Sequence, residues 1–225
     1  MTKICVSGSE GKMGSRIIEL AKEDPELEVA AGFDLDGNAE LGITACECLI
    51  DFTSPKATVE HLELCEKLKK PIVIGTTGLS EEDKSKIKEA SSHIPVVLSA
   101  NMSTGVNLLF KLIEDASKVL GDEYEISILE AHHAEKKDSP SGTAKEMERI
   151  AKSIKGQDTD VAISSVREGE IVGEHTITFE SDVDLIEITH SAKTRDIFAK
   201  GALKAAKFVA GKKSGLFTMK DVLNI

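Results

Sequence analysis

The densest group of reactive side chains in the sequence lies between residues 130 and 144. This segment reads Glu130-Ala131-His132-His133-Ala134-Glu135-Lys136-Lys137-Asp138-Ser139-Pro140-Ser141-Gly142-Thr143-Ala144. An imidazole exchanges protons near neutral pH, an ammonium group can donate one, and hydroxyl and amide groups at a helix start bind carboxylates. Such a set suits hydride addition to an electron-poor C=N or C=C bond, because the carbanion or enamine that is left must be protonated.

The adjacent histidines also have simpler interpretations. Two neighbouring residues on a strand point to opposite faces, and Lys136 can fold back toward one of them. Either histidine can instead be a packed or surface residue. A zinc site would need a third ligand, and none stands at a recognised spacing, so we expect no metal. We interpret His61 and His93 as structural, and His175 and His190 carry little signal.

A second group of residues indicates a nucleotide site near the start of the chain. The turn Gly8-Ser9-Glu10-Gly11-Lys12-Met13-Gly14 follows an apolar run and opens a helical pattern. Glycines let the backbone approach a pyrophosphate, whose charge then rests on the N–H groups of the helix start. Asp34 stands 20 residues after Gly14, where a carboxylate accepts hydrogen bonds from ribose hydroxyls. The alternative is an ordinary strand-to-helix turn and a surface aspartate.

The residue after Asp34 bears on the choice of nucleotide. It is Leu35, which cannot hold a 2′-phosphate as an arginine would, so these residues favour NADH over NADPH. Lys12 can offset this preference. Two further turns follow later strand patterns and are candidates for the nicotinamide half, or are simply turns: Gly75-Thr76-Thr77-Gly78 and Ser99-Ala100-Asn101-Met102.

The first hundred residues alternate short β-branched runs with amphipathic stretches, the pattern of successive strand–helix units. We predict strands at Lys3–Ser7, Glu28–Phe33, Cys48–Phe52, Pro71–Gly75 and Pro95–Ser99, and helices at Lys12–Lys22, Pro55–Lys69 and Glu81–Ala90. Parallel strands need covered faces, so this segment is expected to be a Rossmann-like, doubly wound α/β domain with ligands at the carboxyl ends of its strands.

After Asn101 the pattern changes to that of an α+β unit with a mixed or antiparallel sheet. The predicted helices are Thr104–Val119, Thr143–Ile154 and Arg195–Ala210, the predicted extended segments are Glu123–His132, Val161–Arg167, Glu174–Glu180 and Asp184–Ser191, and a short tail covers Gly215–Ile225. The predicted fold class is therefore α/β, with a second α+β domain.

The charge and hydrophobicity of the chain limit the kinds of molecule it is expected to bind. The 225 residues include 28 Lys and Arg against 39 Asp and Glu, a net charge of −11, which disfavours nucleic acid and anionic membranes. No apolar run suits a signal peptide or reaches the roughly 18 residues of a membrane span, so a cytoplasmic protein is expected. The four cysteines lack metal-site spacing and are expected to be reduced, packed thiols: Cys5, Cys46, Cys48 and Cys65.

Over nearly its whole length the sequence resembles the dihydrodipicolinate reductase (4-hydroxy-tetrahydrodipicolinate reductase) family of the diaminopimelate route to lysine. The His-His-x-x-Lys and Pro-Ser-Gly-Thr string at 132–143 is the most specific motif. The others are Gly8–Gly14, Asp51-Phe52-Thr53-x-Pro55, Gly75–Gly78, Ile171-Val172-Gly173-Glu174-His175 and Gly215-Leu216-Phe217-x-Met219-x-Asp221-Val222-Leu223.

The resemblance implies an oxidoreductase that passes hydride from NADH or NADPH to a cyclic dicarboxylate. It implies proton donors or acceptors at His132 and Lys136, and substrate-carboxylate contacts from His133, Ser141, Gly142 and Thr143. The implied nucleotide site comprises Gly8, Ser9, Glu10, Gly11, Lys12, Met13, Asp34, Gly75, Thr76, Thr77, Ser99, Ala100, Asn101 and Met102.

The resemblance also implies a discontinuous first domain and a tetramer. Residues 1–102 and 195–225 would bind the nucleotide, and residues 103–194 would bind substrate and assemble a homotetramer. Ala134-Glu135 give one cation fewer than many relatives have, Met102 replaces an aromatic residue, Lys12 replaces an arginine, and the stretch from Asp34 to Asp51 is short. A non-catalytic NAD-sensing module and a dehydrogenase for another amino-acid precursor are the alternative functions.

Overall fold

The computed structural model describes residues 1–35 and 37–225. The chain divides into two compact units. The first unit comprises Met1–Thr104 and Asp196–Ile225, so it is built from both ends of the chain, and the second is Gly105–Arg195. None of the helices in the described residues is both long enough and apolar enough to cross a membrane.

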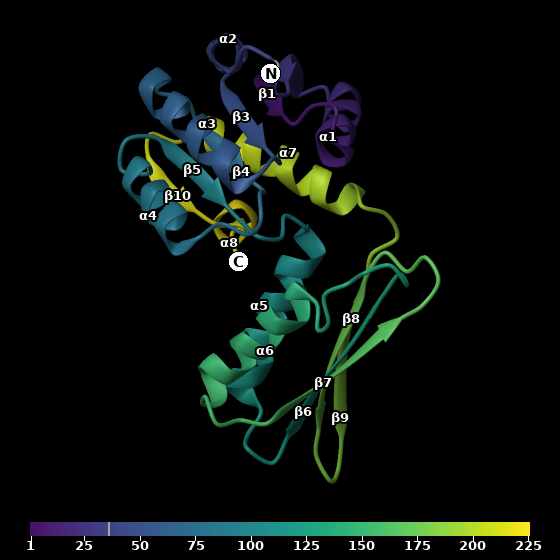
Figure 1. The fold of residues 1–225 in the computed structure, drawn as a ribbon. Coiled ribbons are helices and arrows are strands. Elements are labelled where there is room, and N and C mark those ends of the chain that lie inside the picture. The colour runs from purple at the N-terminus through teal and green to yellow at the C-terminus, as the bar shows by residue number, and fades with distance from the viewer. Residues whose placement is uncertain (36) are drawn as a thin grey trace. The chain divides into compact units, whose positions relative to one another are not determined.

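The described part of the first unit contains a six-stranded sheet in the order β10-β5-β4-β3-β1-β2, and every neighbouring pair is parallel. Figure 1 shows this sheet between layers of helices. Its strands are β1 (Thr2–Ser7), β2 (Leu27–Phe33), β3 (Cys48–Asp51), β4 (Ile72–Ile74), β5 (Pro95–Leu98) and β10 (Gly215–Phe217). Strands β2 and β3 pair with opposite sides of β1, so the strand order reverses at β1. Doubly wound folds bind ligands at such a switch point.

Helices cover both faces of the parallel sheet. They are α1 (Lys12–Glu23), α2 (Ala39–Ala45), α3 (Pro55–Leu68), α4 (Glu81–Ala90), α7 (Asp196–Ala210) and α8 (Met219–Leu223). One apolar cluster joins the sheet to α1, α7 and α8, and another joins it to α2, α3 and α4. The predicted doubly wound sheet is thereby confirmed. The contact with α7 is close, because a methyl group on Gly201 would lie 1.7 Å from the carbonyl oxygen of Met102.

Two parts of this unit differ from the sequence expectation. Helix α2 falls in the short stretch where no element was predicted, and the Asn38 side chain caps it by accepting a hydrogen bond from the Leu41 N–H. The segment predicted only as a tail forms β10 and α8. Strand β10 extends the parallel sheet beside β5, and the capping box of Thr218 and Asp221 starts α8. Both segments are too short for a periodic pattern to show in the sequence.

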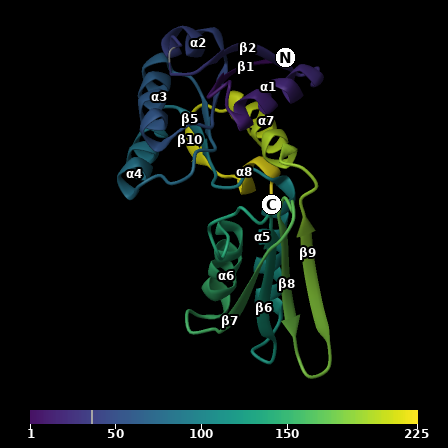
Figure 2. The same ribbon diagram turned by 45° about the vertical axis from the view of Figure 1, so that its right-hand side comes forward.

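The second unit has a mixed four-stranded sheet in the order β7-β6-β8-β9. Its strands are β6 (Glu125–His132), β7 (Val161–Arg167), β8 (Glu174–Glu180) and β9 (Leu185–Ser191). Strand β6 is parallel to β7 and antiparallel to β8, which forms an antiparallel hairpin with β9. Helices α5 (Thr104–Val119) and α6 (Gly142–Lys155) pack on one face of the sheet (Figure 2). The predicted mixed sheet is confirmed.

Candidate active site

The glycine-rich turn connects β1 to α1 and is closely packed against the start of this helix. Gly8 has a φ of +75°, a conformation that favours glycine. A methyl group on Gly14 would lie only 2.0 Å from the Gly8 carbonyl oxygen, so the helix packs directly on the turn. Gly11 caps α1 without a side-chain hydrogen bond. No side chain therefore caps the first N–H groups of α1, where the motif predicts a phosphate.

The structure places Asp34 against this turn. Its Oδ2 accepts hydrogen bonds from the Ser9 hydroxyl at 2.6 Å and from the Glu10 N–H at 3.0 Å. Two donors from one loop hold the carboxylate at the end of β2, beside the helix start. Lys12 is exposed on the first turn of α1, and Leu35 is 98% exposed.

The other two predicted nucleotide segments follow β4 and β5 at the same edge of the sheet. The hydroxyl of Thr76 donates to the buried carboxylate of Asp51 at 3.1 Å, which fixes the turn after β4 to the end of β3. Ser99 donates to the carbonyl oxygen of Asn101. Met102 was predicted to line the nucleotide site. Its side chain is instead only 2% exposed and belongs to the apolar core.

A buried polar network organises the chemically reactive part of the second unit. His132, the last residue of β6, places Nδ1 2.5 Å from Oε2 of Glu130. Arg167, at the end of β7, donates to both oxygens of Glu130, at 3.0 and 2.7 Å. Glu130 has no solvent exposure and His132 only 8%. A buried carboxylate is thus paired with one cation and one imidazole.

The same carboxylate reaches the start of α6. The Ser141 N–H donates to Oε1 of Glu130 at 3.2 Å, and the Ser141 hydroxyl caps α6 by accepting from the Ala144 N–H. Gly142 is exposed on the first turn of this helix, and His133 is half-buried. The network therefore links His132 to the helix start that was predicted to bind carboxylates.

Lys136 lies in the loop between β6 and α6. Its ammonium group pairs with Asp138 at 2.8 Å and is about one-fifth exposed. Arg167 donates to the carbonyl oxygen of Asp138, so the guanidinium that pairs with Glu130 also holds this loop. The loop of the reactive motif is in this way fastened to the end of β7 through Arg167.

His175, on β8, completes the network. Its Nε2 lies 3.0 Å from the Ser141 hydroxyl, and its ring meets that of His132 edge-on at 5.0 Å. Glu130, His132 and His175 bring donor atoms within 4.8 Å of one another, a spacing that also suits metal ligands. Since Arg167 already pairs with both oxygens of Glu130, we attribute this cluster to an ion-pair network.

Burial and charge set the protonation of these groups. Burial raises the pKa of Glu130, but hydrogen bonds from Arg167, Ser165 and His132 outweigh it and bring the pKa to about 2. Burial lowers the pKa of His132 from its usual value, against the opposing effect of Glu130. Burial, reinforced by the charge of His132, lowers the pKa of His175 to about 4. The carboxylate is ionised and His175 is neutral at pH 7.

Glu130, Arg167 and His175 were given no role in the site from the sequence alone. A signal was present, since residues 126, 128, 130 and 132 all point to the buried face of β6, and a glutamate and a histidine there require partners. The partners depend on strand pairing: β6 sets His132 opposite Arg167 and Glu130 opposite His175. The pairing becomes known only with the fold.

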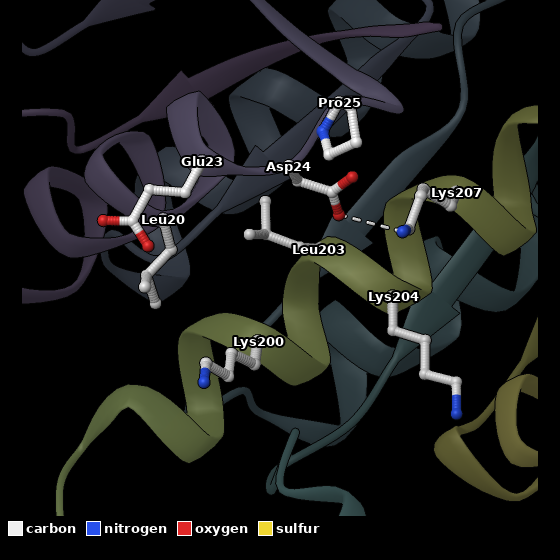
Figure 3. Close-up of a pocket in the computed structure, with 8 residues that line it drawn as sticks. All are labelled: Leu20, Glu23, Asp24, Pro25, Lys200, Leu203, Lys204 and Lys207. Atoms are coloured by element: carbon white, nitrogen blue, oxygen red, sulfur yellow. Dashed lines mark hydrogen bonds and ion pairs between the residues drawn. The ribbon is translucent and has the colours of Figure 1, made fainter.

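An open groove of about 570 Å³ lies elsewhere on the first unit. It lies where α1 ends and β2 begins, at the opposite edge of the sheet from the glycine-rich turn, and the Lys207 ammonium contacts Asp24 there at 2.9 Å (Figure 3). Its lining residues are Leu20, Glu23, Asp24, Pro25, Lys200, Leu203, Lys204 and Lys207. None of the predicted nucleotide or substrate residues lines it.

A doubly wound parallel sheet with a glycine-rich first turn is the architecture of many pyridine-nucleotide-dependent oxidoreductases. Residues 2–102 match the family described as dihydrodipicolinate reductase, N-terminus, and residues 105–223 match dihydrodipicolinate reductase, C-terminus. The chain therefore belongs to the dihydrodipicolinate reductase family, which confirms the resemblance seen in the sequence. It also disfavours the two alternative functions.

Curated relatives named 4-hydroxy-tetrahydrodipicolinate reductase agree over the full length. One from Dechloromonas aromatica is 41% identical over 264 positions, covering 100% of this chain and 98% of the relative. One from Geotalea uraniireducens is 40% identical over 266 positions and is covered completely. These alignments are longer than the 225 residues of this chain, so the chain is shorter than both relatives.

Solved structures agree on the fold. A dipicolinate-bound dihydrodipicolinate reductase from Paenisporosarcina sp. TG-14 has a TM-score of 0.84 at 21% identity, with 97% of each chain covered. A probable dehydrogenase from Thermotoga maritima has a TM-score of 0.64 at 12% identity, with 98% of this chain and 92% of that chain covered. At these identities the likeness describes architecture alone.

We predict that the second unit loses stability as the pH falls from about 6.5 to 4. Because the pKa of His175 is about 4 in the folded protein and 6.5 in the unfolded chain, the unfolded chain binds more protons in this range. The free energy of unfolding then falls by up to about 1.4 kcal/mol per pH unit. Tyr124 is the one tyrosine, there is no tryptophan, and Tyr124 lies in this unit, so urea unfolding followed by tyrosine fluorescence measures the effect.

His175→Gln should reduce this pH dependence. His133→Gln is the matched control, because it removes a half-buried imidazole from outside the Glu130 network. Equal slopes in wild type and His175→Gln would show that His175 is not the group responsible.

Proposed function

We propose that the protein reduces 4-hydroxy-tetrahydrodipicolinate to tetrahydrodipicolinate in the diaminopimelate route to lysine. The observation that carries the proposal is the network that ties His132 to the start of α6, in a chain of the dihydrodipicolinate reductase family. A bound NADH or NADPH would supply the hydride to ring carbon C4, and the 4-hydroxyl group of the substrate would leave as water.

The glycine-rich turn is the proposed site for the nucleotide pyrophosphate. The first N–H groups of α1 point at this position, and Gly8 and Gly14 leave no side chain in the way. The proposed nicotinamide contacts come from the turns that follow β4 and β5, with Met102 taking part through its backbone, since its side chain lies in the core.

The start of α6 is the proposed carboxylate site. Ser141 is buried and already committed to Glu130 and the helix cap, so Gly142 and Thr143 would supply N–H groups at the positive end of α6. His133 would contact the second carboxylate from the loop that follows β6. A substrate with two carboxylates matches two such positions.

Lys136 and His132 are the proposed proton carriers. After hydride transfer the neighbouring ring carbon needs a proton, and the ammonium group of Lys136 holds one in its ion pair with Asp138. Burial lowers the pKa of His132, so a free enzyme at neutral pH carries this imidazole mostly in its neutral form. A bound dicarboxylate would favour its protonation.

The position of Asp34 supports NADH as the preferred nucleotide. The carboxylate is held beside the helix start by Ser9 and Glu10, where it can accept from the ribose hydroxyls of NADH and would repel the 2′-phosphate of NADPH. Lys12, the cation of the glycine-rich turn, is exposed on α1.

The uncovered face of the second sheet supports assembly into a homotetramer. Strand pairing places three exposed apolar side chains on the face opposite α5 and α6: Leu129, Val166 and Leu185. Strand β9 is also a free edge of this sheet among the described residues. Exposed apolar surface of this kind marks interaction sites. We further propose a cytoplasmic location, since all four cysteines are buried free thiols.

Loss of either proposed proton carrier should slow the chemical step. Lys136→Ala and His132→Ala are expected to lower kcat by about 10²–10⁴-fold, whereas His133→Ala should act mainly on KM. The measurement couples purified dihydrodipicolinate synthase to this protein and follows NADH absorbance. Wild-type turnover in the Lys136→Ala, His132→Ala double variant would refute the assigned roles.

Asp34 should govern the choice of nucleotide. We expect a higher kcat/KM with NADH than with NADPH in the wild type, and a lower ratio in Asp34→Ala, because the repulsion of the 2′-phosphate is removed. Glu40→Ala, which removes an exposed carboxylate on α2, is the control. A strong NADPH preference in the wild type contradicts this prediction.

The tetramer predicts a molar mass in solution about four times the 24.2 kDa of the chain. Light scattering on a sizing column measures it. Leu129→Glu with Leu185→Glu should lower the mass by placing charges on the uncovered sheet face, while Leu41→Glu, on α2 of the first unit, should not. A monomeric wild type rules the tetramer out.

A further inference from the structure

The Glu130 carboxylate has hydrogen-bond partners on three different elements. Oε2 lies 2.5 Å from His132 Nδ1 and accepts a hydrogen bond from Arg167 at 3.0 Å. Oε1 accepts hydrogen bonds from Arg167 at 2.7 Å and from the Ser141 N–H at 3.2 Å. An ionised carboxylate only accepts hydrogen bonds, so each of these partners must donate. His132 must therefore carry a proton on Nδ1.

The other ring nitrogen of His132 faces a glycine. A methyl group built on Gly173 would lie 3.1 Å from Nε2 of His132, so the absence of a side chain leaves room beside this atom. With Nδ1 committed to Glu130, Nε2 is the nitrogen left to exchange a proton. In neutral His132 this nitrogen accepts, and in the imidazolium it donates.

We infer that Glu130, held by Arg167, is a positioning residue for the proposed reaction: it fixes His132 in the Nδ1–H tautomer and ties it to the start of α6. The inference rests on the proposed function and assigns roles to two residues beyond the proton carriers. One carboxylate would then hold both the proton-exchanging ring and the helix start that binds a substrate carboxylate.

Arg167 has a separate part in this arrangement. A carboxylate with no solvent exposure is costly to keep ionised unless a cation pairs with it, and Arg167 supplies that cation through two hydrogen bonds. The charged and titratable groups around His132 are Glu130 on β6, Arg167 on β7, His175 on β8 and Lys136 on the following loop. Glu130 is the sole anion among them, so its removal must disfavour the imidazolium.

The first test needs no variant of Glu130. In protein labelled with ¹⁵N-histidine, the nitrogen shifts of His132 report which ring nitrogen is protonated, and His132→Gln assigns the signal among the six histidines. The neutral ring should carry its proton on Nδ1. A wild-type ring protonated on Nε2 overturns the inference, whatever the activity.

The second test is Glu130→Gln, with Glu125→Gln as the matched control because it removes an exposed carboxylate from the same strand. Glu130→Gln should lower kcat by about 10²-fold or more and leave KM for NADH within about 3-fold. In the pH profile of kcat, the limb that belongs to His132 is the one that His132→Gln abolishes. In Glu130→Gln this limb should move to lower pH, because the anion beside the imidazolium is lost. A purely structural role would not move this limb.

A third variant covers the case in which Glu130→Gln fails to fold. Gly173→Ala keeps the Glu130 network but crowds Nε2, so it should lower kcat by about 10-fold or more with the Nδ1–H tautomer retained. A wild-type kcat in Gly173→Ala overturns the inference and leaves the proposed function standing. The same holds if the pH limb of His132 does not move in folded Glu130→Gln. A wild type without reductase activity overturns the proposed function, and this role of Glu130 with it.

Discussion

The buried carboxylate of Glu130 is the constraint on which the arrangement of the second unit depends. A charge removed from water must be paired and fully hydrogen-bonded. Meeting that requirement fixes the end of β7 through Arg167, the end of β6 through His132 and the start of α6 through Ser141. The same contacts leave one nitrogen of His132 uncommitted, so the requirement for charge pairing and the proposed chemistry are met by one set of atoms.

The first unit buries a second carboxylate and satisfies it differently. Oδ1 of Asp51 accepts from the hydroxyls of Thr53, Thr58 and Thr76, and Oδ2 contacts His61 Nδ1 at 2.7 Å. No arginine or lysine takes part in these contacts. They hold the ends of β3 and β4 and the start of α3 together at the edge of the sheet where the glycine-rich turn lies. Asp51 and Thr53 belong to the Asp51-Phe52-Thr53-x-Pro55 motif but are not among the proposed ligand-binding residues. This network gives them a structural role.

Under the proposed function, the two units would supply different halves of a reduction. The first offers helix N–H groups and a fixed carboxylate, the features that bind a nucleotide, and the second offers an imidazole, an ammonium group and a helix start for a dicarboxylate. Within the second unit the cations lie close to the candidate site while the chain as a whole carries −11. Under the same proposal, a strongly acidic protein would bind an acidic substrate, because local fields from Arg167, Lys136 and the α6 dipole act at short range.

The sequence by itself determined the fold class and the places of the glycine-rich turn, Asp34 and the His132–Lys136 motif, because periodicity and glycine spacing are local properties. Most predicted elements, such as Glu81–Ala90 and Val161–Arg167, coincide with the observed ones. The tertiary structure alone decided that Arg167 and His175 surround Glu130, that the last residues join the sheet as β10, and that Met102 is buried. Each of these depends on which distant strands or helices pair, and pairing over long sequence separations leaves no periodic trace in the chain.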